Sequence, residues 1–416
     1  MTYLRCLGAS HEVGRSAFLL STDVNLLLDY GIKIFDQSRK PKYPITFPEE
    51  IDAAIITHAH LDHSGFVPYL YSFTNVKWYA TPPTRDICEV MFKDSMKIMG
   101  EELPYNESHY IKALRNWHPV FYRKEVRFRD TRINFFDAGH IAGSAMLEIR
   151  HDKRKIVYTG DFNTENTRMH KGAEPIEDVD TLIIEGTYGL REHPNRAELE
   201  KKLISNIEET LDEGGHVLLP AFALGRSQEL IAILGNHKFD APIFLDGMSK
   251  AITDIYQKYP YYFDEFEQFR QALESITMVT SPALKKEVLK KPSIIITTAG
   301  MMEGGPVLNY LFNLNPNSKI IFTGYNVEGT NGHRLLNEGK IIKDGYELSV
   351  NLPAEYLDFS AHVGRTGLLD FIKKANPSKI ILVHSDSQNA DQFTTQLRDD
   401  FGYDAIAPQP DDKIDL

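Results

Sequence analysis

The sequence predicts an α/β protein in which one domain is interrupted by a second, parallel α/β domain. Three features of the 416 residues support this prediction. Short apolar runs that end in a polar residue dominate the first half of the chain. From about residue 195, strand-like runs alternate with helical patterns, as in parallel sheets. Near residue 380, "KIILVHSDS" is again a short apolar run that ends in polar residues, as in the first half of the chain. We expect a first domain at 1–194, an inserted domain at 195–350 and a return segment at 351–416.

The first half contains five runs that we interpret as buried strands. "AFLLS", "NLLLDYG" and "AAIITHAH" are apolar runs that end in polar residues. "KIVYTGDFN" and "TLIIEGTYG" repeat this pattern, and each carries one carboxylate at its C-terminal end. A rigid sheet can hold such side chains at one open edge, where binding and catalytic groups are commonly found.

The second half alternates helices and strands. "RAELEKKLISNIEETLDEGG" has helical periodicity and ends at a glycine pair. "HVLLPAFALGRSQELIAILGN" and "PIFLDGMSKAITDIYQKY" each predict a strand, a loop and a helix. "PSIIITTAGMMEGGP" and "KIIFTGYNVEGT" predict strands that lead into glycine-rich loops. This order is typical of a parallel α/β unit.

Composition excludes some classes of protein. The net charge of −12 argues against a generic nucleic-acid binder, but it allows a local basic cleft and bound metal cations. Cys6 and Cys88 are the only cysteines, so we expect two separate thiols and a reducing cytoplasm. No apolar run is long enough to span a bilayer, and the first residues lack a signal-peptide pattern.

The segment "THAHLDHSG" carries the strongest chemical signal. Six consecutive positions in it contain His58, His60, Asp62 and His63. Imidazole nitrogens and a carboxylate without thiolates suit zinc most naturally, although manganese and iron accept the same ligands. The spacing can serve two ions, which need further ligands. The additional candidates, each just after an apolar run, are His140, Asp161 and His384.

The pattern HxHxDH, followed by a histidine and a strand-end aspartate, resembles the metallo-β-lactamase fold, an αββα sandwich. The resemblance implies that His58, His60 and His140 hold one zinc ion. It implies that Asp62 and His63 hold a second zinc ion and that Asp161 bridges both. Two Zn²⁺ per chain are therefore the expected cofactors. Asp29 in "LLLDYG" matches the aspartate of the family's first motif, which supports the metal loop.

Three further residues resemble the β-CASP branch of this fold. Glu185 in "IIEGTYG" resembles its motif A, and His362 in "FSAH" resembles motif B. His384 resembles motif C, which supplies the remaining ligand of the second zinc. Members of this branch carry an inserted domain between motifs A and B, and they cut nucleic acids. Two stretches depart from the family pattern, namely Ser385 after motif C and "VGRTG" after motif B.

"THAHLDHSG", together with "EVGRS", "GMMEGGP" and "GYNVEGTNGHRL", resembles archaeal members of the cleavage-and-polyadenylation-specificity-factor group. It does not resemble the ribonuclease J group. The resemblance begins at the first strand, so we expect the KH-type RNA-binding domains of the longer archaeal members to be absent.

The resemblance also implies a mechanism. Two divalent ions close together lower the pKa of a bridging water, so hydroxide can attack the phosphorus atom in line. Asp62 is assigned to this catalytic set as well as to the metal ligands. His362 is expected to act as general acid on the leaving ribose oxygen, oriented by Glu185. The products would carry a 5′-phosphate and a 3′-hydroxyl.

Six residues are predicted to contact RNA: Arg226, Ser227, Lys250, Tyr325, Arg334 and Ser360. Arg226 and Ser227 lie at a predicted helix start, which is a natural anion site. Lys250 and Arg334 are expected to contact backbone phosphates, and Tyr325 is expected to stack on a base. The remaining nine histidines, including His193, are interpreted as structural or exposed.

The predicted function is that of a zinc-dependent ribonuclease acting on single-stranded RNA in RNA processing or decay. Internal cleavage and 5′-to-3′ removal of nucleotides both fit the sequence. One alternative is a catalytically silent RNA-binding scaffold subunit, against which the complete ligand set argues. The other is a hydrolase of a non-RNA substrate or a tRNA 3′-processing enzyme, against which the long insertion between Glu185 and His362 argues. RNA-processing partner proteins and a homodimer are compatible with the sequence, whereas a membrane is not expected.

Overall fold

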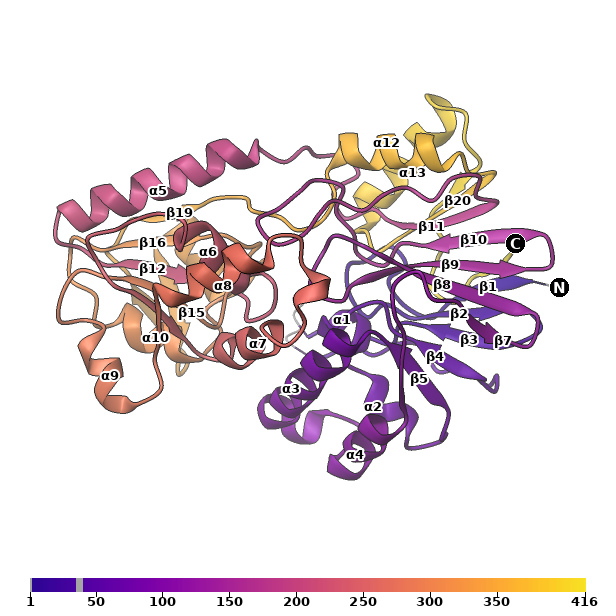
Figure 1. Cartoon of the computed structure of the whole chain (residues 1–416), viewed down its shortest axis with the longest axis horizontal. Coiled ribbons are helices and arrows are strands. Elements are labelled where there is room, and N and C mark those ends of the chain that lie inside the picture. Colours follow the sequence, from indigo (N-terminus) through magenta and orange to yellow (C-terminus); the bar gives the residue numbers. More distant parts are fainter. Residues whose placement is uncertain (1, 35–39) are drawn as a thin grey trace.

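A computed structural model of the chain describes residues 2–34 and 40–416. It has two lobes, which lie side by side in Figure 1. The right-hand lobe, here called the two-sheet domain, contains both ends of the chain, because the last strand pairs with the first. The left-hand lobe, here called the inserted domain, is built on a single large sheet. The predicted α/β architecture with an inserted domain is confirmed.

The two-sheet domain consists of two seven-stranded sheets that face each other. The first sheet has the order β22-β1-β2-β3-β4-β5-β6, and the second has the order β21-β20-β11-β10-β9-β8-β7. The strands of the first sheet are β1 (Tyr3–Cys6), β2 (Phe18–Ser21), β3 (Asn25–Leu28), β4 (Ala53–Ile55), β5 (Lys77–Ala80), β6 (Trp117–Pro119) and β22 (Lys413–Asp415). Those of the second are β7 (Val126–Phe128), β8 (Thr131–Asp137), β9 (Ala145–His151), β10 (Arg154–Tyr158), β11 (Thr181–Glu185), β20 (Lys379–Val383) and β21 (Ala405–Ile406).

Helices cover both outer faces of this pair of sheets, so the layers follow the order αββα (Figure 1). Beside the first sheet lie α1 (Leu61–Ser64), α2 (Val67–Leu70), α3 (Pro82–Met99), the 3₁₀ turn η1 (Gly100–Glu102) and α4 (Glu107–Arg115). Beside the second sheet lie α12 (Arg365–Ala375) and α13 (Ser387–Asp399). Because helices cover one face and the partner sheet covers the other, central strands such as β11 are buried along their whole length.

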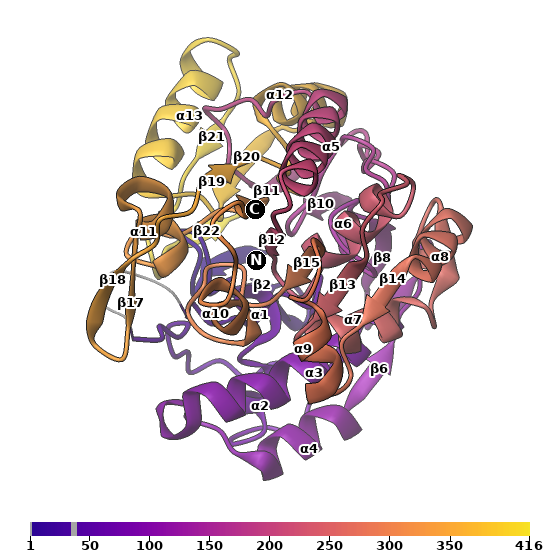
Figure 2. The ribbon, with the colours of Figure 1, turned by 90° about the vertical axis from the view of Figure 1, so that its left-hand side faces the viewer.

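The inserted domain contains a six-stranded sheet in which every pair of neighbours is parallel. Its strands, in the order β14-β13-β15-β12-β16-β19, are β14 (Ile276–Met278), β13 (Ile243–Asp246), β15 (Ile294–Thr297), β12 (Val217–Pro220), β16 (Lys319–Phe322) and β19 (Ala354–Tyr356). The helical elements between them are α5 (Arg196–Asp212), α6 (Arg226–Leu234), α7 (Ser249–Tyr256), η2 (Pro260–Tyr262), α8 (Phe266–Glu274), α9 (Pro282–Glu287), α10 (Pro306–Leu311) and α11 (Asn331–Glu338). A hairpin of β17 (Lys340–Lys343) and β18 (Tyr346–Ser349) lies beside α11 (Figure 2).

Helix α5 shows how local chemistry sets the entry into the inserted domain. The side chain of Asn195 accepts a hydrogen bond from the backbone N–H of Glu198 and thereby caps the helix. Leu199, Leu203 and Ile207 follow at helical spacing and are buried. The helix ends before Gly214, whose φ of +77° suits glycine.

The six-stranded sheet of the inserted domain extends slightly beyond residue 350, the predicted end of the insertion. Strand β19 pairs with β16 through Ile320, Ile321 and Phe322, so residues 354–356 still belong to this sheet. This strand follows a polar hairpin and contains no apolar run, so the sequence pattern does not predict it. The chain returns to the two-sheet domain only after Tyr356.

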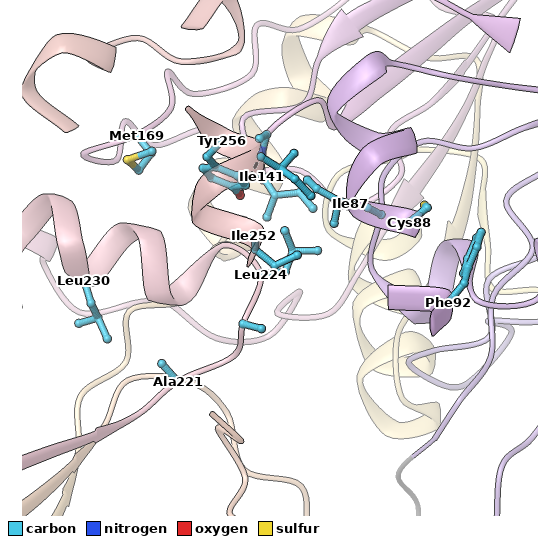
Figure 3. Packing of buried hydrophobic residues seen from close by; sticks show 14 of the residues in the cluster. Ile87, Cys88, Phe92, Ile141, Met169, Ala221, Leu224, Leu230, Ile252 and Tyr256 are labelled. Atoms are coloured by element: carbon cyan, nitrogen blue, oxygen red, sulfur yellow. Dashed lines mark hydrogen bonds between the residues drawn. The ribbon is translucent and has the colours of Figure 1, made fainter. Parts of the chain in front are cut away.

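A continuous apolar core joins the two lobes. Ile87 and Ile141 of the two-sheet domain lie in the same buried cluster as Leu224, Ile252 and Tyr256 of the inserted domain (Figure 3). The Tyr256 hydroxyl also accepts a hydrogen bond from the backbone N–H of Ala142 at 3.4 Å. The inserted domain therefore packs directly against the loop that carries Ile141.

Two predictions about the whole chain can be compared with the structure. Cys6 and Cys88 are free and buried, as expected, and burial raises the pKa of each thiol to about 12. None of the described helices combines the length and apolar character needed to cross a lipid bilayer.

Replacing Ile252 with alanine tests the apolar core between the lobes. Because Ile252 is fully buried, Ile252→Ala should lower the free energy of unfolding by about 2–5 kcal/mol, and Ile252→Val by about 1 kcal/mol. Urea denaturation followed by circular dichroism measures both values. The matched control is Ile98→Ala, since Ile98 is 71% exposed and should change stability little. Equal effects at positions 98 and 252 would contradict the packing role.

Candidate metal centre and active site

Strand ends of the two-sheet domain bring the predicted metal ligands to one edge. His58 and His60 follow β4, while Asp62 and His63 lie in the short helix α1. The turn is tight at Gly31, where a Cβ atom would lie 1.8 Å from the carbonyl oxygen of Asp62. His140 lies between β8 and β9, Asp161 follows β10, and His384 follows β20. Residues far apart in sequence thus converge because their strands are neighbours.

The first group of potential ligand atoms belongs to His58, His60, His140 and Asp161. The Nδ1 atom of His60 lies 3.2 Å from Nε2 of His58 and 3.1 Å from Nε2 of His140. A carboxylate oxygen of Asp161 lies 3.6 Å from Nε2 of His58. All four ligand atoms lie within 4.8 Å of one another.

The second group belongs to Asp62, His63, Asp161 and His384. Nε2 of His63 lies 3.2 Å from Oδ1 of Asp161, and Nδ1 of His384 lies 3.3 Å from the same oxygen. Nε2 of His384 lies 3.2 Å from Oδ2 of Asp62. The structure therefore brings all seven predicted ligands together, with Asp161 in both groups.

The chemistry of these side chains fits metal binding. Burial holds the pKa of His58 and His140 well below the ordinary imidazole value and lowers that of His60 to about 4, so their lone pairs are free at neutral pH. Among the described residues, no hydrogen bond reaches the buried Oδ1 of Asp161. Clustered neutral imidazoles and carboxylates without thiolates are the ligand set of zinc and related divalent cations.

Asp29 lies behind the ligand loop and orients it. Its carboxylate accepts hydrogen bonds from the backbone N–H of Thr57 at 2.7 Å and from the Tyr158 hydroxyl at 2.7 Å. Nδ1 of His63 lies 2.7 Å from the same carboxylate, which leaves Nε2 directed at Asp161. A carboxylate in this position sets the tautomer and the ring orientation of a metal-binding histidine.

His362 and Glu185 form a pair at the border of the two groups. Nδ1 of His362 lies 2.9 and 3.1 Å from the two carboxylate oxygens of Glu185, which is buried. The opposite nitrogen, Nε2, lies 4.0 Å from Asp161. Burial alone would lower the pKa of His362, but the carboxylates of Glu185 and Asp161 outweigh it and raise the pKa to about 9. The pair can therefore hold a proton at Nε2, facing the metal groups.

Models of known domain families match three parts of the chain. Residues 18–184 match the metallo-beta-lactamase superfamily domain, residues 227–335 match the Beta-Casp domain, and residues 347–408 match the Zn-dependent metallo-hydrolase RNA specificity domain.

Full-length relatives agree with these matches. The chain is 34% identical to RNase aCSPSF2 of Saccharolobus solfataricus over all of this chain and 85% of that protein. It is 37% identical to Probable RNase MJ4 of Methanocaldococcus jannaschii over 98% of each chain. It belongs to the β-CASP family of metallo-β-lactamase-fold hydrolases. Transcription termination factor FttA of M. jannaschii is 35% identical over 98% of this chain and 70% of its own length.

A crystal structure of a protein of unknown function from Enterococcus faecalis V583 has the same fold. The two structures superpose with a TM-score of 0.66 over both whole chains, at 15% sequence identity. This likeness shows that the fold of the whole chain, including both lobes, also occurs in that protein.

Two of the residues predicted to contact RNA have internal partners in this β-CASP protein. The Ser227 hydroxyl is buried and donates a hydrogen bond to the carbonyl oxygen of Phe222 at 2.7 Å. Nζ of Lys250 lies 2.9 Å from Asp246 and also contacts the carbonyl oxygen of Val279. The sequence shows the residue types but not these partners, and a contact with RNA would compete with them.

The other four predicted RNA contacts are placed differently. Tyr325 is 56% exposed and available for stacking. Ser360 lies beside the active site, where its hydroxyl accepts a hydrogen bond from the backbone N–H of His362 at 3.2 Å. Nη1 of Arg334 lies 3.9 Å from Glu338 on the same helix. Arg226 is almost fully buried at the start of α6.

The two departures from the family pattern have structural explanations. The Ser385 hydroxyl is buried, donates to the carbonyl oxygen of Gly186 at 2.9 Å and accepts from Asn389. In "VGRTG", the side chain of Arg365 donates to the carbonyl oxygen of Gly189 at 2.8 Å. Both therefore act in packing the chain behind the site rather than within it.

The structure also adds residues that sequence reasoning did not assign. The Thr187 hydroxyl donates a hydrogen bond to Glu185 at 2.5 Å and lies 3.1 Å from the carbonyl oxygen of His384. The Tyr188 ring lies between His193 and His362, at 4.6 and 6.1 Å between ring centroids. Their position directly after Glu185 in "EGTYG" is the only signal in the sequence that could have indicated them.

Removing the carboxylate of Asp29 tests its support of the ligand loop. Asp29→Ala leaves His63 without its orienting partner, so the affinity for Zn²⁺ should fall about 10–100-fold. Competition with a chelating dye measures this affinity. Tyr158→Phe is the control, because it removes one donor to Asp29 and leaves the carboxylate in place. Unchanged zinc affinity in Asp29→Ala would exclude the support role.

Proposed function

We propose that this protein is a ribonuclease that hydrolyses phosphodiester bonds of single-stranded RNA with two Zn²⁺ per chain. One observation carries the proposal: two four-residue ligand groups share Asp161 and lie next to a histidine that a buried glutamate orients. The match of residues 347–408 to an RNA specificity domain and the names of the relatives support RNA as the substrate.

The ligand assignment follows the two groups. His58, His60 and His140 would hold one ion, Asp62, His63 and His384 would hold the other, and Asp161 would contact both. When bound, such a pair of cations lowers the pKa of water and neutralises charge on a phosphate. Burial and the contacts of Asp29 with Thr57 and His63 hold the ligand side chains in position.

His362 supplies the proton for the leaving group. Glu185 accepts the hydrogen bond from Nδ1–H and favours the charged imidazolium form, whose second proton lies on Nε2 and faces the site. The leaving ribose oxygen takes this proton as the bond to phosphorus breaks. Glu185 itself is held by the backbone N–H of Phe162 at 3.1 Å and by Thr187 at 2.5 Å, so it acts as a fixed orienting group.

The alternative functions are less well supported. A silent scaffold subunit has no need of seven ligand side chains in reach of one another, or of the Glu185–His362 pair. A hydrolase of small esters does not need the inserted domain that closes one side of the site. Two free thiols also favour a reducing, cytoplasmic location for the enzyme.

Metal content and cleavage products test the proposal together. Two zinc ions per chain are expected for the wild type, and fewer for the Asp62→Ala/His63→Ala double variant, measured by elemental analysis. On the same preparations, single-stranded RNA bearing a 5′-monophosphate or a 5′-hydroxyl is digested and the products are separated by size. Internal fragments indicate an endonuclease, whereas mononucleotides favoured by the monophosphate indicate a 5′-end exonuclease. Two zinc ions with no cleavage above the double variant would refute the ribonuclease function.

The general-acid role of His362 has its own test. His362→Ala should retain two zinc ions but lose about 10²–10⁴-fold in kcat, because only the proton donor is removed. Rates on RNA are compared with those of His118→Ala, which removes an exposed imidazole on the edge strand β6. Turnover at the wild-type rate in His362→Ala would eliminate this histidine as the acid.

A further inference from the structure

A cluster of charged residues lies where the chain crosses between the two lobes, next to the proposed active site. We call it the crossover cluster. Its members come from the segment between β11 and α5, from the first residue of α5, from the first turn of α6 and from the segment that follows β19. They are Arg191, His193, Arg196, Arg226, Glu229 and Asp358.

The two carboxylates of the crossover cluster are already engaged. Asp358 is contacted by Arg191, lies 3.2 Å from Nδ1 of His193 and accepts a hydrogen bond from the Tyr356 hydroxyl at 3.0 Å. Glu229 accepts a hydrogen bond from Arg196 at 2.5 Å and another from the backbone N–H of residue 168 at 3.2 Å. Arg191 and Arg196 therefore take up the two carboxylates, and the third guanidinium group of the cluster, that of Arg226, bonds to neither.

Arg226 is the member without a partner. Its side chain is only 9% exposed, yet within residues 2–34 and 40–416 no hydrogen bond or ion pair reaches its guanidinium group. Burial and the nearby charge of Arg196 lower its pKa to about 10, although the carboxylates of Glu229 and Asp358 act in the opposite direction, so it stays a cation at neutral pH. Nε of Arg196 and Nε2 of His193 are buried without partners as well. A buried, unpaired cation is costly, which indicates that an anion completes this site.

Two neighbours of Arg226, Gly225 in sequence and Arg196 in the crossover cluster, lie near segments that carry catalytic groups. A Cβ atom on the preceding Gly225, whose φ is +79°, would lie 2.8 Å from the Ile141 side chain, next to His140. On the other side, Arg196 lies 5.6 Å from the ring of Phe359, in the segment that ends at His362. The start of α6 therefore lies against the segment that carries His140.

We propose that Arg226, with Arg196 beside it, forms a subsite for an RNA backbone phosphate adjacent to the one that is cleaved. The inference rests on the proposed ribonuclease function and names the group that would position its substrate. A planar guanidinium can donate two parallel hydrogen bonds to phosphate oxygens, and the start of a helix adds further positive potential. Arg226 would thus be a positioning residue for the polymer, outside the reacting atoms.

The test compares a polymer with a substrate that has a single phosphate. Arg226→Met should lower kcat/KM for single-stranded RNA about tenfold or more, the effect of losing a hydrogen bond to a charged group. Hydrolysis of bis(p-nitrophenyl) phosphate should stay within about twofold, because this substrate has no second phosphate to place in the subsite. The salt dependence of RNA binding should also weaken, with a slope lower by about 1.

Stability separates this role from a structural one. Removing an unpaired buried charge should leave the Tm of the ligand-free zinc enzyme unchanged or raise it. A lower Tm together with equal losses on both substrates would overturn the proposal. If Arg226→Met does not fold, Arg226→Lys keeps the charge without the planar fork and should show a smaller loss that is again specific to RNA. If Arg226→Lys keeps wild-type activity on both substrates, the proposed phosphate subsite is overturned.

A matched control and the wild type complete the design. Arg270→Met removes an exposed guanidinium on α8 and should change neither substrate's kinetics. If the wild type binds RNA without cutting it, the ribonuclease function fails, and the same variants are compared through their dissociation constants for a labelled decauridylate. Weaker binding by Arg226→Met alone would then support the subsite, whereas equal binding by both variants, or no binding by the wild type, would overturn it.

Discussion

The carboxylate of Asp161 is the group on which the site depends. It is almost completely buried, and it lies within 4 Å of nitrogens from His58, His63, His140, His362 and His384. A buried carboxylate is stable only when positive charge or hydrogen-bond donors surround it, and one of its oxygens has no hydrogen bond among the described residues. Divalent cations would satisfy it, and the ring nitrogens of His58, His60 and His140, 3.1 and 3.2 Å apart, are close enough to bind one such ion together.

This arrangement requires the strand ends of two sheets to meet at one edge. β4 delivers the histidine-rich loop, and β10, β11 and β20, which lie next to one another in the second sheet, deliver Asp161, Glu185 and His384. The core between the sheets holds these strands in register. Metal chemistry and folding are therefore coupled, since the same strands form the core and carry the ligands.

The inserted domain completes the site from the other side. It is anchored by the apolar core around Ile252 and Tyr256, and its helix α6 begins against Ile141, one residue from His140. The connections between the lobes run through the crossover cluster, whose Arg226 is the one buried Lys or Arg side chain among the described residues. Acidic residues repel nucleic acid elsewhere on the surface, so the metal ions and this cluster would direct an anionic polymer to the site.

Much of the fold and most of the site were determined by the sequence itself. Apolar runs that end in polar residues identified several central strands of both lobes, because a buried strand is mostly apolar and polar residues tend to follow it. His58, His60, Asp62 and His63 are close in space because they are close in sequence. His140, Asp161 and His384 could be predicted because each ends a strand, and ends of neighbouring strands lie together.

Tertiary structure alone decided which partners the polar residues have. Ser227 and Lys250 matched the pattern of phosphate contacts, but Phe222, Asp246 and Val279 occupy their donors. β19 pairs with β16, although the polar sequence around β19 does not predict a strand there. His193 and Arg196 carry no motif, yet they converge with Arg226 from segments 30 or more positions apart. Local sequence determines what a residue can do, whereas long-range packing determines which groups remain unpaired, and an unpaired buried charge is visible only in three dimensions.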